Sequence, residues 1–149
     1  MKYVSRYFLI CLLFLSVSCK QNAKDNMELA SKNNSQDPGI TTENGGSLTP
    51  LEVKEMIRDN PDLIIIDVRT PRELESGMVE NAINIDMYDR NFLLDIKKLG
   101  KDEKYVIYCS VGGRSSAASE LMIKEGFTSV FNSKKGFTSL KAEGITLKK

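Results

Sequence analysis

The sequence predicts an α/β fold, in which helices flank a mainly parallel central sheet in a three-layer sandwich. Strand-like and helix-like segments alternate from residue 48 onward, as in sheets joined by crossover helices. Two apolar runs, at residues 63–66 and 105–108, lack polar alternation, which indicates strands covered on both faces. Helix start and stop signals separate these runs. Because ligands bind beyond the carboxyl ends of strands in such folds, chemistry is expected there.

Residues 1–19 have the features of an export signal. Lys2 and Arg6 precede an apolar run, residues 7–17, that is short for a bilayer span. The run ends in Leu-Ser-Val-Ser-Cys, which is similar to a bacterial lipobox and implies lipidation of Cys19. We therefore expect an exported lipoprotein anchored on the periplasmic side of a bacterial membrane. A soluble periplasmic protein after ordinary cleavage, or an uncleaved anchor, are the alternatives.

Residues 20–47 are polar, contain Asn44-Gly45-Gly46 and show no sustained hydrophobic period. They are interpreted as a flexible linker. The alternative is that the stretch around Ile40 adds an edge strand to the folded part. A chain of 149 residues leaves room for one folded domain, expected over residues 48–149.

The folded part begins with a helix over residues 50–59. Thr49, Pro50 and Glu52 form a capping-box pattern, and Asn60-Pro61 ends the helix. Thr70-Pro71-Arg72-Glu73 repeats the pattern, so a short helix is expected over residues 71–77, with Glu73 interpreted as its cap. Further helices are expected at residues 91–99, 115–125 and 137–143, and strands at 63–68, 82–85, 105–108 and 129–131.

The composition excludes several classes of function. The chain has no histidine, which removes Ser-His-Asp and Cys-His hydrolase mechanisms and the commonest metal ligand. The formal net charge is +1 and no basic stripe with interleaved aromatic residues is present, so nucleic acid is not an expected partner. We expect no cofactor and no metal site.

Cys109 is the candidate nucleophile. Of the three cysteines, Cys11 would leave with the signal and Cys19 would carry lipid, so one thiol remains. An unpaired thiol in an oxidising compartment is a liability unless it has a use.

The segment from Cys109 to Arg114 joins an expected strand to an expected helix. A sulfur at a helix N-terminus is favoured as thiolate. Gly112 and Gly113 would let successive amides face the sulfur, a curl that a side chain would hinder. Arg114 could hold an incoming oxyanion. Substrate contacts are therefore expected from Ser110, Val111, Gly112, Gly113 and Arg114.

This loop resembles the Cys-x-x-Gly-x-Arg loop of the rhodanese-like domain family. Residues 67–74, Asp-Val-Arg-Thr-Pro-Arg-Glu-Leu, and residues 77–85 are similar to two further family segments, in the same order. The family's usual residues are replaced at Met78, Asn81 and Leu140. The resemblance covers residues 48–147 and implies a single-domain sulfurtransferase of rhodanese-like fold. Asp67 and Arg69 are interpreted as a structural ion pair that supports the loop.

The resemblance implies that Cys109 takes a sulfane sulfur from a small anionic donor such as thiosulfate and passes it as a persulfide to cyanide or a thiol. Four residues lie between Cys109 and Arg114, whereas related phosphatases and arsenate reductases have five, so those activities are disfavoured. The remaining alternative is a non-catalytic or persulfide-carrier module that binds a partner protein, a possible acceptor, at the membrane.

Overall fold

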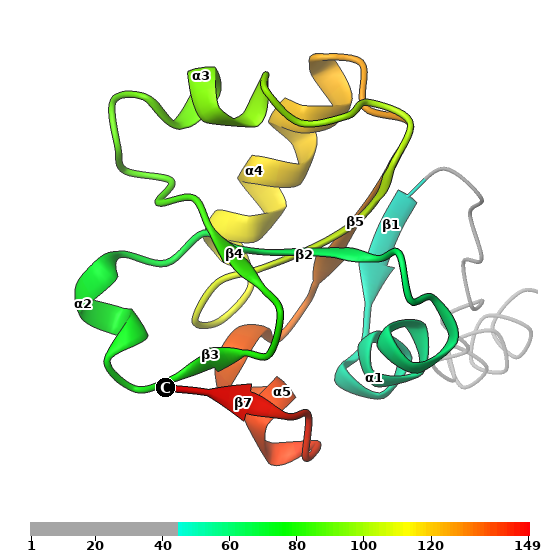
Figure 1. Cartoon of the computed structure of the whole chain (residues 1–149), viewed down its shortest axis with the longest axis vertical. Helices are drawn as coiled ribbons and strands as arrows, with labels where there is room; N and C mark the ends of the chain where they lie inside the picture. The colour runs from blue at the N-terminus through cyan, green and yellow to red at the C-terminus, as the bar shows by residue number, and fades with distance from the viewer. Residues whose placement is uncertain (1–44) are drawn as a thin grey trace, which may run out of the picture. The chain divides into compact units, whose positions relative to one another are not determined.

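The computed structural model describes residues 45–149, which form seven strands and five helices within that range (Figure 1). The strands are β1 (Gly45–Leu48), β2 (Ile64–Asp67), β3 (Met78–Val79), β4 (Ile83–Asn84), β5 (Lys104–Tyr108), β6 (Ser129–Ser133) and β7 (Leu147–Lys148). The helices are α1 (Pro50–Asp59), α2 (Pro71–Leu74), α3 (Phe92–Ile96), α4 (Gly113–Lys124) and α5 (Gly136–Ala142).

Five strands form one parallel sheet in the order β1-β6-β5-β2-β4. The strands β5 and β6 lie inside it and are buried along most of their length, as the unbroken apolar runs predict. A separate two-stranded ribbon pairs β3 with β7 in antiparallel fashion.

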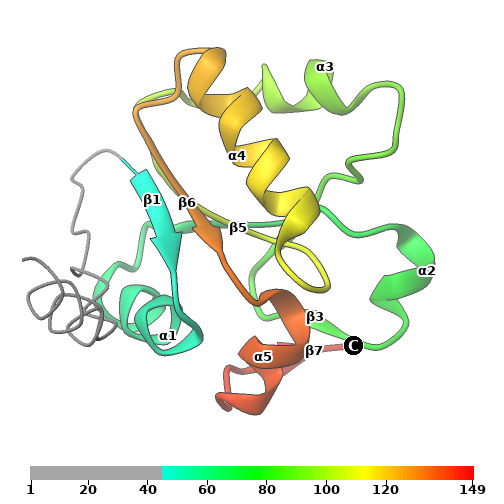
Figure 2. The ribbon, with the colours of Figure 1, turned by 180° about the vertical axis from the view of Figure 1, so that it is seen from behind.

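The sheet separates two apolar cores, so the domain has three layers. One core packs β-strand side chains such as Val106 and Phe131 against α1 and α5. The other packs Ile66 and Ile107 against α3 and α4, and it includes Cys109. Figures 1 and 2 show α3 and α4 on one side of the sheet and α1 and α5 on the other. The predicted α/β class with a mainly parallel sheet is confirmed.

Both predicted capping boxes begin helices, but the second helix is shorter than expected. In α1, the Thr49 N–H donates to Glu52 Oε2 at 2.7 Å, and the helix reaches Asp59. The second, α2, ends at Leu74 instead of residue 77. The physical reason is that the chain turns after Leu74, where the Gly77 N–H donates to the Leu74 carbonyl and Gly77 has φ of 98°, a left-handed conformation that ends a helix. Arg69 also donates to the carbonyls of Glu73 and Gly77.

The linker prediction is wrong at residues 45–47, which belong to the edge strand β1. In the left-handed conformation, with φ of 126°, Gly45 lies so close to β6 that an added Cβ would stand 2.4 Å from the carbonyl oxygen of Val130. Glycine here permits close contact between strands, whereas the sequence pattern of residues 44–46 predicts a linker. The sequence also did not predict β3 and β7, each of which has only two residues.

Several predictions concern residues outside the described range. The export signal, Cys19, residues 20–44 and the stretch around Ile40 lie before residue 45, so these stay predictions. Among residues 45–149, none of the helices has the length and apolar character needed to cross a membrane.

Candidate functional site

The Cys109 loop lies at the carboxyl end of β5, where ligands bind in folds of this class. β5 ends at Tyr108 and α4 begins at Gly113, two residues earlier than the sequence indicated, so Arg114 belongs to the first turn of α4. The loop is held from behind by the start of α5, since the Phe137 N–H donates to the Cys109 carbonyl at 2.7 Å. Gly136 packs so closely that a Cβ there would lie 2.4 Å from the same oxygen.

The Cys109 sulfur faces polar donors of the loop and of α4. The Gly112 N–H donates to Sγ at 3.1 Å, and the Ser115 hydroxyl lies 3.7 Å from it. The same hydroxyl lies 3.1 Å from the Gly112 carbonyl, so its single proton serves one acceptor at a time. Although Cys109 is only 1% exposed, its sulfur points at amide donors. Ser115, which the sequence did not indicate as a site residue, is therefore one of the hydrogen-bond donors around the Cys109 sulfur.

These donors favour the thiolate. Burial raises the pKa of the Cys109 thiol, because it penalises the charged form. Hydrogen bonds from the backbone and hydroxyl of Ser115 and from the amides of Val111 and Gly112 act in the opposite direction and outweigh burial. The net result is a pKa below the ordinary value of a cysteine thiol. A buried sulfur that is nevertheless stabilised as an anion has the properties of a nucleophile.

The two glycines of the loop have different roles. Gly112 has φ of 102°, and a Cβ there would stand 2.1 Å from the Lys134 carbonyl oxygen. Gly113 has no heavy atom within 4 Å of an added Cβ. The prediction that a side chain would hinder the curl at both positions is therefore wrong for Gly113, which is simply the first residue of α4. Only Gly112 requires glycine for both conformation and space.

The structure places Arg114 against a carboxylate that the sequence analysis had interpreted only as a helix cap. Arg114 donates from Nη1 to Glu73 Oε2 at 2.7 Å and from Nη2 to Oε1 at 2.6 Å. Ser110 joins them, since its hydroxyl donates to Glu73 and accepts from Arg114. The guanidinium also lies 5.5 Å from the ring centre of Tyr88. The expected oxyanion-binding arginine is thus already paired.

Asp67 and Arg69 form the buried ion pair that the sequence analysis expected. Arg69 Nη2 lies 2.7 Å from Asp67 Oδ2, with side-chain exposures of 2% and 0%. The guanidinium stacks at 3.8 Å on the ring of Phe137 and holds the carbonyls at the end of α2. The hydrogen bonds of the Arg69 side chain go to Asp67 and to residues 73–77. That this ion pair supports the Cys109 loop stays a prediction.

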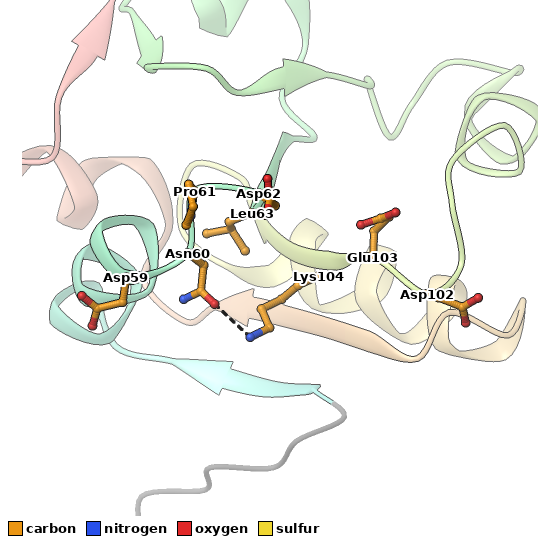
Figure 3. Close-up of a pocket in the computed structure, with 8 residues that line it drawn as sticks. All are labelled: Asp59, Asn60, Pro61, Asp62, Leu63, Asp102, Glu103 and Lys104. Atoms are coloured by element: carbon orange, nitrogen blue, oxygen red, sulfur yellow. Dashed lines mark hydrogen bonds between the residues drawn. The ribbon is translucent and has the colours of Figure 1, made fainter.

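A shallow hollow of about 290 Å³ lies at the opposite, amino end of the strands (Figure 3). Its polar lining includes a hydrogen bond from Lys104 Nζ to Asn60 Oδ1 at 3.1 Å. It is lined by Asp59, Asn60, Pro61, Asp62, Leu63, Asp102, Glu103 and Lys104. None of these residues carries a thiol. Within residues 45–149 no cluster of three or more histidine, cysteine or acidic side chains is arranged to hold a metal.

Comparisons with known proteins agree with this geometry. The profile of the rhodanese-like domain matches residues 49–143. A sulfurtransferase from Allochromatium vinosum is 29% identical over 97 residues, covering 64% of this chain and 87% of the relative. A tRNA uridine(34) hydroxylase from Cytophaga hutchinsonii is 36% identical over 94 residues, covering 61% of this chain. The chain spans only 30% of that hydroxylase's length.

Solved structures show the same fold. The rhodanese-related protein from Thermoplasma volcanium has a TM-score of 0.60 and 31% identity, covering 68% of this chain and 96% of that one. The rhodanese-like domain protein from Staphylococcus aureus has a TM-score of 0.60 and 29% identity, covering 70% of this chain and 99% of that one. With the matched profile covering more than half of its length, the chain belongs to the rhodanese-like domain family.

Proposed function

We propose that this protein is a thiosulfate-type sulfurtransferase whose Cys109 carries the transferred sulfur. Family membership and the sulfurtransferase relative support sulfur transfer in general. The observation that carries the finer proposal is the hydrogen-bonded Cys109 sulfur at the start of α4, with its lowered pKa. Activation of a thiol by amides and a helix N-terminus is what a sulfur nucleophile needs at neutral pH.

The reaction proceeds in two displacements. The Cys109 thiolate attacks the outer sulfur of thiosulfate, a sulfur–sulfur bond forms, and the sulfur–sulfur bond of the donor breaks to release sulfite with its electron pair. The persulfide keeps one negative charge on its terminal sulfur. Cyanide or a thiolate then attacks that sulfur, takes it as thiocyanate or a new persulfide, and regenerates the Cys109 thiolate.

The loop suits the persulfide as well as the thiolate. Amides of Val111 and Gly112 and the Ser115 hydroxyl are already directed at Sγ, so a second sulfur with the same charge meets the same donors. Ser110, Val111, Gly112, Gly113 and Arg114 are the proposed substrate contacts. Asp67 and Arg69 are proposed to act only through the fold.

The test is an intact mass after incubation with thiosulfate. The full chain should gain the mass of one sulfur atom, and Cys109→Ser should gain nothing. Steady-state formation of thiocyanate should likewise require Cys109. Equal rates in the two proteins would disprove the catalytic role.

The alternative persulfide-carrier module is separated from an enzyme by turnover. An enzyme forms many equivalents of thiocyanate per Cys109, whereas a carrier loads once and unloads only to a partner protein. Loading without multiple turnover would replace the enzyme proposal with the carrier.

We also propose that the protein acts as a lipoprotein on the periplasmic side of the membrane. The support is the lipobox-like end of residues 1–19. Cys19→Ala should move the protein from the membrane fraction to the soluble fraction of cells. An unchanged distribution would contradict lipidation.

A further inference from the structure

The carboxylate of Glu73 is surrounded by hydrogen-bond donors. Its Oε1 accepts from the Ser110 hydroxyl and from Arg114 Nη2. Its Oε2 accepts from Arg114 Nη1 at 2.7 Å, the Thr70 N–H at 3.1 Å and the Thr70 hydroxyl at 2.9 Å. Within residues 45–149 these partners are all donors, so an amide in place of the carboxylate would point an NH₂ group at other donors.

This arrangement joins two parts of the chain that the sequence pattern treats separately. Thr70 is the N-cap of α2, while Ser110 and Arg114 belong to the Cys109 loop and the first turn of α4. The Arg114 ion pair is the main reason that the pKa of Glu73 is lowered, and burial opposes it. The Glu73 side chain is 32% exposed and the Arg114 side chain is 19% exposed, so the pair lies at the surface beside the loop.

The charge balance of the site follows from this contact. Arg114 lies in the first turn of α4, directly after the loop, and Glu73 cancels its positive charge. Arg114, Glu73 and the Cys109 thiolate taken together therefore carry a net negative charge.

We propose that Glu73 is a positioning and specificity-determining residue, which holds Ser110 and Arg114 in place and screens the charge of Arg114 against doubly charged anionic donors. This inference rests on the proposed function for its substrate class. A dianion such as thiosulfate must pull Arg114 away from Glu73 before it gains the full ion pair, whereas a donor or acceptor of lower charge depends less on this cation. Glu73 therefore weakens the binding of thiosulfate relative to the binding that an unpaired Arg114 would give, and thiosulfate remains a donor.

The first test does not depend on sulfur transfer. Iodoacetate and iodoacetamide alkylate the same thiol and differ by one negative charge, so the ratio of their rates at Cys109 reports the local potential. Glu73→Gln should raise this ratio about three- to tenfold, the order expected for one unscreened charge near the surface. Glu52→Gln is the matched control, because Glu52 caps α1 in the same way and should leave the ratio unchanged.

Two further variants separate charge from structure. Arg114→Gln should lower the ratio, since it leaves Glu73 unpaired. The double variant Glu73→Gln/Arg114→Gln restores the net charge and should return the ratio to near the wild-type value. An unchanged alkylation ratio in Glu73→Gln would overturn the proposal. So would a double variant whose ratio does not return toward the wild-type value. Thermal unfolding of each variant identifies any that fail to fold, and the cycle is then completed with Glu73→Ala.

The kinetic test uses thiosulfate as the dianion. In Glu73→Gln, kcat should fall because Ser110 and Arg114 are no longer held in place. The KM for thiosulfate should also fall, because the positive charge of Arg114 is no longer screened. A merely structural role would lower kcat and leave KM unchanged or raised. Absence of turnover in wild type would end the proposed function and leave the alkylation test standing. Wild-type turnover with an unchanged alkylation ratio would end this inference alone.

Discussion

The sequence Thr-Pro-x-Glu occurs twice in the chain, and the glutamates of the two copies make different contacts. Before α1, Glu52 accepts a hydrogen bond from the Thr49 N–H, and among the described residues its hydrogen bonds stay within the capping box. Before α2, Glu73 makes the same local contact with Thr70 and also binds Arg114 of α4. The same local pattern only caps a helix in one place and also borders the candidate site in the other, because different elements pack against it.

The largest effect is expected from a substitution that moves the Cys109 loop away from Glu73 and leaves both capping boxes intact. Gly112→Ala brings a Cβ within 2.1 Å of a backbone carbonyl at positive φ. The cost should be about 2–4 kcal/mol, with loss of thiol activation, measured by denaturant unfolding and by Cys109 alkylation. Gly113→Ala is the matched control and should change stability by less than about 1 kcal/mol. Equal damage from both substitutions would contradict the geometry of the loop.

The next effect compares the boxes directly. Glu52→Ala and Glu73→Ala should each weaken a helix start by about 1 kcal/mol. Only Glu73→Ala also releases Arg114 and Ser110, so it should lower sulfur-transfer kcat about 10- to 100-fold, as expected for misplaced groups near a reacting atom. Thermal unfolding and steady-state kinetics of both variants measure these differences. Similar kcat values in the two variants would show that the boxes are equivalent after all.

The properties of the thiol should depend on α4 and not on α1. Because the pKa of Cys109 is lowered, its alkylation by iodoacetamide should rise with pH and level off at a lower pH than that of an ordinary thiol. Ser115→Ala removes the hydroxyl, one of the donors that favour the thiolate, and keeps the backbone N–H, so the profile should shift to higher pH. Ser116→Ala is a control, since its hydroxyl is directed at Glu120. If Ser115→Ala left the pH profile unchanged, the Ser115 hydroxyl would not be one of the donors that stabilise the thiolate.

These contrasts explain what could be predicted from the sequence. The cap before α1, the unbroken apolar strands and the position of Cys109 depend on local spacing and burial, so the pattern carries them. The role of Glu73 depends on Arg114, which is 41 residues away in sequence, and the capping pattern already supplied a sufficient local explanation. Gly45 likewise signals a break in isolation but a close strand contact once β6 lies beside it.

The same reasoning explains the predictions about Gly112 and Gly113. Both are glycines in one loop, and a sequence gives no way to know that the Lys134 carbonyl approaches one and solvent surrounds the other. The short strands β3 and β7 were missed for a related reason. Each has only two residues, and their pairing joins Met78 and Val79 to residues 147–148, which are far away in the sequence.

The smallest effect is expected at the threonines of the two boxes. In α1 the Thr49 hydroxyl accepts from the Glu52 N–H at 3.3 Å, so Thr49→Val leaves that donor without its cap and should cost about 1 kcal/mol. In α2 the Thr70 hydroxyl donates to Glu73, whose carboxylate keeps Arg114 and Ser110 as partners. Thr70→Val should therefore cost only about 0.5 kcal/mol, a difference measurable as a smaller fall in Tm. A larger loss at Thr70 would mean that the hydroxyl, and not Arg114, fixes the Glu73 carboxylate, and the contrast between the two boxes would then rest on the helix cap alone.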